Sequence, residues 1–145
     1  MQRHYPARKL NNGNVEVRTW WGLWELPKDG EVDEDVIEAF TTGHCHSFAL
    51  AMHEKTGWDM YACSYDPGYD TPAHVFIRHP KGKFVDITGF IPKGSRWFRD
   101  GVVRVSKEDI YEFFDYLRPQ PKLAAPFVKS VLKQIGYKPQ IKKAA

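Results

Sequence analysis

Two cysteines are all that the 145-residue chain contains, so it can form at most one disulfide. It has no run near the roughly 18 apolar residues of a membrane-spanning helix. No apolar segment follows the charged N-terminal residues MQRHYPARKL, as one would in a secretory signal. These absences predict a cytoplasmic chain with reduced thiols and no membrane segment. Aromatic residues make up 14% of the chain, which excludes disorder throughout.

Acidic residues are missing from the C-terminal end of the chain. Seven of the 21 basic residues and none of the 18 acidic ones lie in 118–145, so residues 1–117 hold 14 basic against 18 acidic residues. Such asymmetry can indicate contact with nucleic acid or another anion. The wide spacing of the lysines is typical of a solvated helix face with a basic tail. Nucleic-acid binding, with Trp20, Trp21 and Trp24 as stacking surfaces, is therefore an alternative rather than the first hypothesis.

The pattern of the chain divides it into a flexible lead-in over 1–14, one domain over 15–136 and a basic tail over 137–145. Alternating runs of β-formers predict strands, and capped periodic runs predict helices. Helices are expected over 32–40, 45–55, 107–117 and 124–135, and strands over 15–24, 60–65, 74–78, 83–87 and 102–105. This order predicts an α+β fold, with N-terminal helices packed on a small antiparallel sheet and C-terminal helices after it.

Cys45 stands at the expected start of the second helix, in the stretch GHCHSFALAMHEKTGW. The positive end of the helix dipole and the unpaired N–H groups of a first turn favour a thiolate, which is the nucleophilic form. The same N–H groups could hold a developing oxyanion. Cys63 instead lies among apolar residues of an expected strand, and is interpreted as a core thiol.

His74 and Asp86 lie on two strands that the sequence predicts to be neighbours. If HPKG (79–82) is a tight hairpin, the two residues fall nearly opposite each other, because their midpoint is residue 80. A carboxylate would then orient an imidazole that faces the helix-start thiol, as nucleophile, base and orienting group do in covalent catalysis. Asp86 could instead cap the turn before Thr88 and Gly89.

Three segments, 43–49 (GHCHSFA), 73–75 (AHV) and 85–89 (VDITG), together resemble the core of the papain-like and transglutaminase-like cysteine hydrolases. In that superfamily a Cys at a helix start precedes a His and an Asp on adjacent antiparallel strands. The resemblance implies that Cys45 is the nucleophile, that His74 is the general base and then the acid, and that Asp86 orients it. It further implies acyl transfer at an amide or ester of a peptide or protein substrate, with no cofactor.

The chain departs from papain in one respect. Papain carries a Gln shortly before its Cys as an oxyanion donor, whereas no glutamine lies between Gln2 and Gln120 here. This difference favours the transglutaminase-like or bacterial peptidase branches. Thr42, His44 and His46 flank Cys45 and could supply oxyanion donors or line the substrate cleft. Tyr69, in the loop before His74, and Trp21 could also line that cleft. The loop 66–72, just before His74, would be the natural lid.

Two other kinds of protein fit parts of the pattern. A non-catalytic binding protein could keep the same fold without the chemistry. A zinc module would take its ligands from Cys45, His46 and His74. His46 and His53 lie two helical turns apart, however, whereas paired zinc ligands on a helix usually lie one turn apart.

Overall fold

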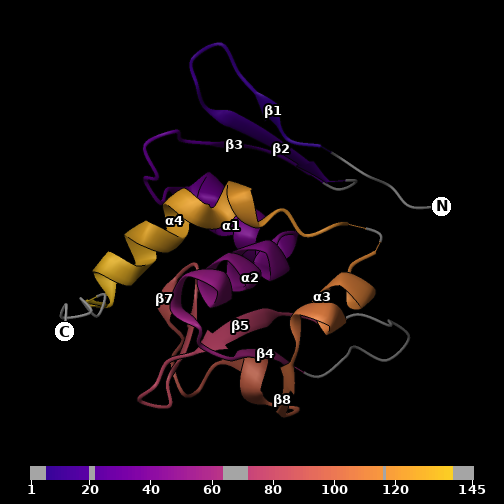
Figure 1. The fold of residues 1–145 in the computed structure, drawn as a ribbon, viewed down its shortest axis with the longest axis vertical. Coiled ribbons are helices and arrows are strands. Elements are labelled where there is room, and N and C mark those ends of the chain that lie inside the picture. Colours follow the sequence, from indigo (N-terminus) through magenta and orange to yellow (C-terminus); the bar gives the residue numbers. More distant parts are fainter. Residues whose placement is uncertain (1–5, 20–21, 64–71, 116, 139–145) are drawn as a thin grey trace, which may run out of the picture.

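The structure, a computed structural model, describes residues 6–19, 22–63, 72–115 and 117–138, and its fold is α+β (Figure 1). The chain begins with a three-stranded antiparallel sheet made of β1 (Arg8–Lys9), β2 (Val15–Thr19) and β3 (Gly22–Leu26), in that order. The prediction that helices come first is therefore wrong. The predicted strand over 15–24 is two paired strands, because this run of β-formers is long enough to fold back on itself. β1 was not predicted, since Arg8 and Lys9 are both exposed and carry no apolar alternation.

The helices follow with boundaries close to those predicted. They are α1 (Glu34–Thr42), α2 (Cys45–Thr56), α3 (Lys107–Phe113) and α4 (Pro121–Gln134). Gly57 ends α2 in a left-handed conformation, with φ of 75°, and Ser106 forms a capping box with Asp109 at the start of α3. α4 begins three residues earlier than predicted, because a proline is well tolerated in the first turn of a helix. None of the described helices is long and apolar enough to cross a membrane.

The second sheet holds five antiparallel strands in the order β7-β6-β5-β4-β8. They are β4 (Met60–Cys63), β5 (Val75–Arg78), β6 (Phe84–Asp86), β7 (Gly89–Phe90) and β8 (Val102–Val105), with the 3-10 turn η1 (Arg96–Phe98) before β8. The sequence predicted four of these strands. The short β7 was not predicted, because two residues are too few to show an alternation.

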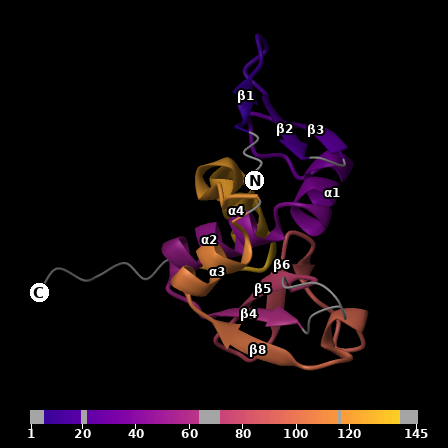
Figure 2. The same ribbon diagram turned by 90° about the vertical axis from the view of Figure 1, so that its right-hand side faces the viewer.

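Helix α2 lies at the centre of the molecule, between the five-stranded sheet and α4 (Figures 1 and 2). Every residue from Cys45 to Met52 is buried. Phe40 of α1 joins the helices, since its ring centroid lies 5.9 Å from that of Phe48 and 5.6 Å from that of Phe127. A second, smaller apolar cluster is built around Cys63, Phe76 and Ile91, with η1 packed against it. The burial of Cys63 there agrees with its interpretation as a core thiol.

Phe40 should therefore carry much of the stability of the helical layer. We expect Phe40→Ala to lower the free energy of unfolding by about 3–5 kcal/mol, because it leaves a cavity where three helices meet. Ile37→Ala, on the exposed side of the same helix, should cost less than about 1 kcal/mol. Urea denaturation of the two variants measures both values, and similar losses would contradict the role of Phe40.

Candidate active site

A buried pair of ionisable side chains, His74 and Asp86, lies on the five-stranded sheet. His74 immediately precedes β5 and Asp86 ends β6, and His74 Nε2 lies 2.9 Å from Asp86 Oδ2. The side chains are 0% and 5% exposed. Val75 and Ile77 point into the main core beneath α2, so the alternation of a strand turns His74 toward the other face of the sheet. His74 and Asp86 are therefore neighbours on the sheet, as the sequence predicts.

The register that brings them together differs from the predicted one by two residues. Ile77 pairs with Val85, so the hairpin is centred on residue 81 rather than 80. Its loop has three residues between His79 and Lys83, and Gly82 takes the left-handed conformation, with φ of 89°, that such a loop requires. Asp86 therefore lies diagonally across from His74 instead of directly opposite. A shift of two residues keeps both side chains on the same face, which a shift of one would not.

The second oxygen of Asp86 is held by Thr88. Asp86 Oδ1 accepts hydrogen bonds from the backbone N–H of Thr88, at 2.8 Å, and from its hydroxyl, at 2.5 Å. Asp86 thus caps the turn and bonds to His74 at the same time. Burial raises the pKa of Asp86, but the hydrogen bond from His74, those from Thr88 and the charge of His74 outweigh it and lower the pKa.

Cys45 is the first residue of α2 and is 7% exposed. It interacts electrostatically with both Cys63 and His74, so α2 begins beside the place where β4 ends and β5 starts. The N–H groups of the first turn of α2 have no intrahelical acceptor. The helix start therefore brings hydrogen-bond donors and a thiol to the His74 imidazole.

The charge state of His74 follows from this position. Burial lowers its pKa, but the hydrogen bond to Asp86, the hydrogen bonding and Coulomb attraction of Cys45, and the charge of Asp86 together raise the pKa to about 9. Nε2 is held by Asp86, so Nδ1 is the ring nitrogen left for the thiol. Nδ1 has no hydrogen-bond partner of standard geometry among the described residues, Cys45 included. His74 is therefore an imidazolium at neutral pH, hydrogen-bonded to Asp86 and near the Cys45 thiol.

Two further buried histidines, His44 and His46, flank Cys45 in sequence. His44 Nδ1 lies 3.0 Å from the Ser47 hydroxyl, which also accepts the backbone N–H of Gln120 at 2.9 Å. His46 Nε2 donates to the carbonyl of Leu117 at 2.9 Å. The His46 ring stacks on that of Phe114, with ring centroids 4.0 Å apart. The segment between α3 and α4 therefore closes over the first turn of α2.

Both histidines stay neutral, in contrast to His74. Burial lowers the pKa of His44 to about 4. Burial, and then repulsion by His44, hold the pKa of His46 well below 6.5, although its bond to Leu117 opposes this. Each keeps one buried ring nitrogen, His44 Nε2 and His46 Nδ1, without a hydrogen-bond partner among the described residues. Positive charge around Cys45 is thus concentrated on His74.

Trp97 is a component of the site that the sequence did not predict. Its ring stacks on the His74 imidazole, with centroids 4.4 Å apart and planes 26° apart, and the Arg96 guanidinium lies 4.6 Å from the Trp97 ring centroid. The stack fixes the plane of the imidazole. The segment SRWFRD carries neither periodicity nor a motif, so no local signal connects Trp97 with His74.

The other predicted site residues are placed differently. The Thr42 hydroxyl donates to the carbonyl of Glu38 within α1, at 2.6 Å, and is not directed at Cys45 as a donor. Tyr69 and Trp21, and most of the loop 66–72, lie outside the described residues. Over the described parts of the chain, no three His, Cys, Asp or Glu side chains are grouped so as to hold a metal ion.

No protein-family model matches the chain, and no curated protein or solved structure shows significant similarity to it.

The pKa of His74 gives a direct test of the site. We expect NMR titration of the imidazole resonances to give a pKa of about 9 for His74 and about 4 for His44. In Asp86→Asn the pKa of His74 should fall, because the carboxylate charge that counteracts the effect of burial is removed. The pKa of His44 should stay the same and serves as the internal control. A His74 pKa near 6.5 in both proteins would show that the pair does not hold the charge.

The same pair should make stability depend on pH. The pKa of His74 rises from 6.5 to about 9 on folding, so the stabilisation is complete below pH 6.5 and is lost as pH rises through about 9. The stability difference between the wild type and Asp86→Asn should therefore be largest near pH 6.5 and shrink toward pH 9.5. Asp59→Asn, which removes an exposed ion pair with Arg104, should show a small difference at both values. Urea denaturation measures all three proteins.

Proposed function

We propose that the protein is a thiol hydrolase or acyltransferase that acts on an amide of a peptide or protein, through Cys45, His74 and Asp86. The observation that carries the proposal is the buried imidazolium of His74, held by Asp86 at 2.9 Å and placed next to Cys45 at the start of a helix. A purely structural His–Asp pair would not need a thiol beside it. Shifted pKa values, such as those of His74 and Asp86, are common among residues that carry out catalysis.

The first chemical step uses the thiolate of Cys45. In this proposal His74 carries the proton: Nε2–H donates to Asp86, and Nδ1 is the ring nitrogen left to exchange a proton with Cys45. The thiolate attacks the carbonyl carbon of the amide, and the electron pair of the C=O bond moves to oxygen. The first-turn N–H groups of α2 stabilise this oxyanion. They take the place of the glutamine donor that papain has.

The second step releases the amine. His74 passes its Nδ1 proton to the leaving nitrogen as the C–N bond breaks, and the acyl group stays on sulfur as a thioester. The neutral imidazole then takes a proton from water or from an acceptor amine, which attacks the thioester. That proton stays on His74 while the sulfur leaves as a thiolate, so the starting pair of thiolate and imidazolium is restored. Hydrolysis and acyl transfer therefore differ only in the second nucleophile.

The two cysteines provide a comparison within one molecule. We expect iodoacetamide to alkylate Cys45 much faster than Cys63 at pH 6–8. The helix start and the imidazolium beside Cys45 favour reaction there, whereas burial raises the pKa of Cys63. In His74→Ala the rate at Cys45 should fall by about tenfold or more, while that at Cys63 stays the same. Mass spectrometry of the two tryptic peptides measures each rate. Equal, slow labelling of both thiols would refute the proposed nucleophile.

Turnover can be tested without knowing the natural substrate. A p-nitrophenyl ester should give a burst of one nitrophenolate per protein, followed by slow turnover, as the acyl group accumulates on Cys45. Cys45→Ala should lose the burst, and Cys63→Ala should keep it. Folded protein with a reactive Cys45 but no acylation by esters or peptide amides would favour the binding-protein alternative.

A further inference from the structure

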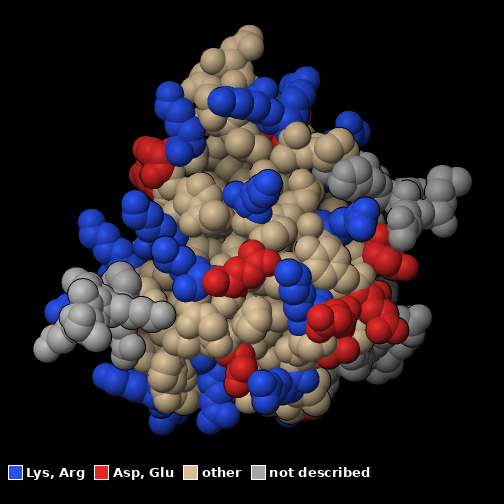
Figure 3. Space-filling view, in the orientation of Figure 1, with Lys and Arg blue, Asp and Glu red and all other residues tan. Residues whose placement is uncertain are grey.

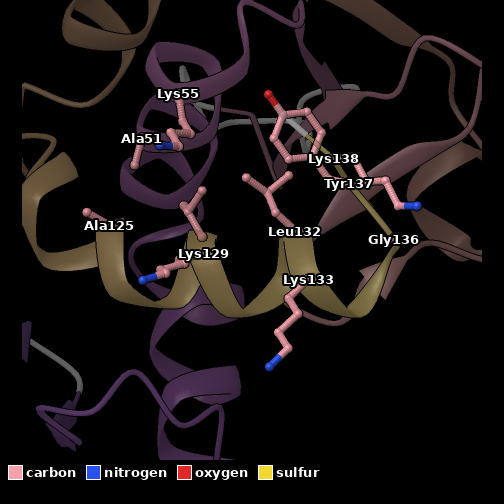
Figure 4. Close-up of a pocket in the computed structure, with 10 residues that line it drawn as sticks. Ala51, Lys55, Ala125, Lys129, Leu132, Lys133, Gly136, Tyr137 and Lys138 are labelled. Carbon is pink, nitrogen blue, oxygen red and sulfur yellow. The ribbon is translucent and has the colours of Figure 1, made fainter. Parts of the chain in front are cut away.

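A groove of about 690 Å³ lies between α2 and α4, away from the candidate active site (Figure 4). Ala51 and Lys55 contribute to it from α2, six and ten residues after Cys45. At 1.5 Å per residue they lie roughly 9–15 Å farther along the helix axis. The groove is therefore separate from the site where the thiol lies.

The floor of the groove is apolar because small side chains leave space between the helices. Ala51 on α2 and Ala125 on α4 face this space, and Val128 and Leu132 form its base. The ring of Tyr137 closes one end, and Figure 4 shows it beside Leu132. An apolar hollow of this size lies within the range of roughly 300–1,000 Å³ that is typical of small-molecule sites.

The rim of the groove is positively charged. Four of its ten lining residues are lysines and none is acidic; they are Lys55, Lys129, Lys133 and Lys138. Figure 3 shows blue side chains gathered over α4, whereas the red ones concentrate near α3. Glu54, next to Lys55 in sequence, forms an ion pair with Lys107, with Glu54 Oε1 3.5 Å from Lys107 Nζ. Three of these four lysines belong to the basic C-terminal end, which the proposed catalysis does not use.

We propose that this groove binds a single-chain amphiphilic anion, such as an acyl carboxylate. The chain would lie on the apolar floor, and the carboxylate would meet the lysines at the rim. Lysine suits this role, because its methylene stem extends the apolar wall and its ammonium group is a point charge without a fixed bonding direction. An anion without an apolar chain would leave the floor empty, and a cationic amphiphile would be repelled.

Other occupants fit the groove less well. A protein partner generally needs about 1,000 Å² or more of total interface, which exceeds a hollow of ligand size. Single-stranded nucleic acid needs a series of stacking rings, and among the described residues Tyr137 alone lines this groove with an aromatic ring. The end of this chain continues with Lys142 and Lys143, which would bring like charges to the lysine rim.

Three probes separate the contributions of chain and charge. We expect dodecanoate, below its micelle-forming concentration, to bind the full-length protein with a stoichiometry of one in calorimetry. It should shift the amide resonances of Ala51, Ala125 and Leu132 in NMR. Dodecyltrimethylammonium, with the same chain and the opposite charge, should bind at least tenfold more weakly. Acetate, with the same head group and no chain, should not bind measurably.

Matched variants locate the site. Ala125→Leu fills the hollow from an exposed helix position and should abolish the binding of dodecanoate. Lys129→Glu and Lys133→Glu should each weaken it by roughly five- to tenfold. Lys122→Glu changes the charge equally on the same helix but outside the groove, and should weaken it less than twofold. Circular dichroism verifies that each variant is folded.

The outcomes decide the proposal independently of catalysis. Cys45→Ala should bind dodecanoate like the wild type, so a failure of the proposed enzyme leaves this result intact. Equal affinity for the two dodecyl probes, or dodecanoate binding that survives Ala125→Leu, would overturn the proposal. Association with phosphatidylglycerol vesicles without binding of free dodecanoate would overturn it in favour of a membrane-surface role.

Discussion

The complete burial of the first two turns of α2 is the constraint around which the rest of the molecule is arranged. A helix that buries eight consecutive residues must be covered on every side. The five-stranded sheet covers one side, α1 and α4 cover another, and the segment between α3 and α4 covers the N-terminal turn. The buried residues include polar ones, and each of these must find a partner that the cover supplies. Ser47 and His46 find theirs at Gln120 and Leu117.

Charge is distributed unevenly across this covered region. Three buried histidines lie near the start of α2, yet among the described residues a carboxylate lies against the ring of His74 alone. Burial lowers the pKa of both His44 and His46, repulsion by His44 lowers that of His46 further, and no carboxylate among the described residues opposes these effects. One carboxylate, itself anchored by Thr88, therefore decides which of three similar side chains is charged.

Much of this arrangement could be predicted from local signals. The boundaries of α2 follow from a helix-forming run that ends at Gly57, and β5 and β6 follow from two apolar alternations joined by a turn. Because a strand alternates with a period of two, His74 and Asp86 were predicted to share a face even though the predicted register was two residues off. The two side chains meet in either register, since diagonal neighbours on a sheet are close enough for an imidazole to reach across.

The features that could not be predicted depend on contacts between distant segments. Trp97 reaches His74 because η1 packs on the far face of the sheet, and no local pattern encodes that packing. The N-terminal sheet was not predicted as a sheet, because β2 and most of β3 lie within the single run 15–24 that the sequence pattern treats as one strand. The groove between α2 and α4 depends on which alanines of two helices face each other, and this is a property of tertiary packing alone.

The hydrogen bonds from His46 to Leu117 and from Gln120 to Ser47 join residues 71 and 73 positions apart in the chain. Cys45, His74 and Asp86 all precede residue 90, yet the polar groups beside Cys45 gain these partners only from residues 117–120. During synthesis from the N-terminus, a nascent chain that ended before this segment would leave Ser47 and His46 without them. Contacts between such distant residues carry a large entropic cost of loop closure, so they form only when most of the domain has collapsed. The surroundings of the Cys45 thiol are therefore completed late in folding, after the C-terminal part of the domain has joined the rest.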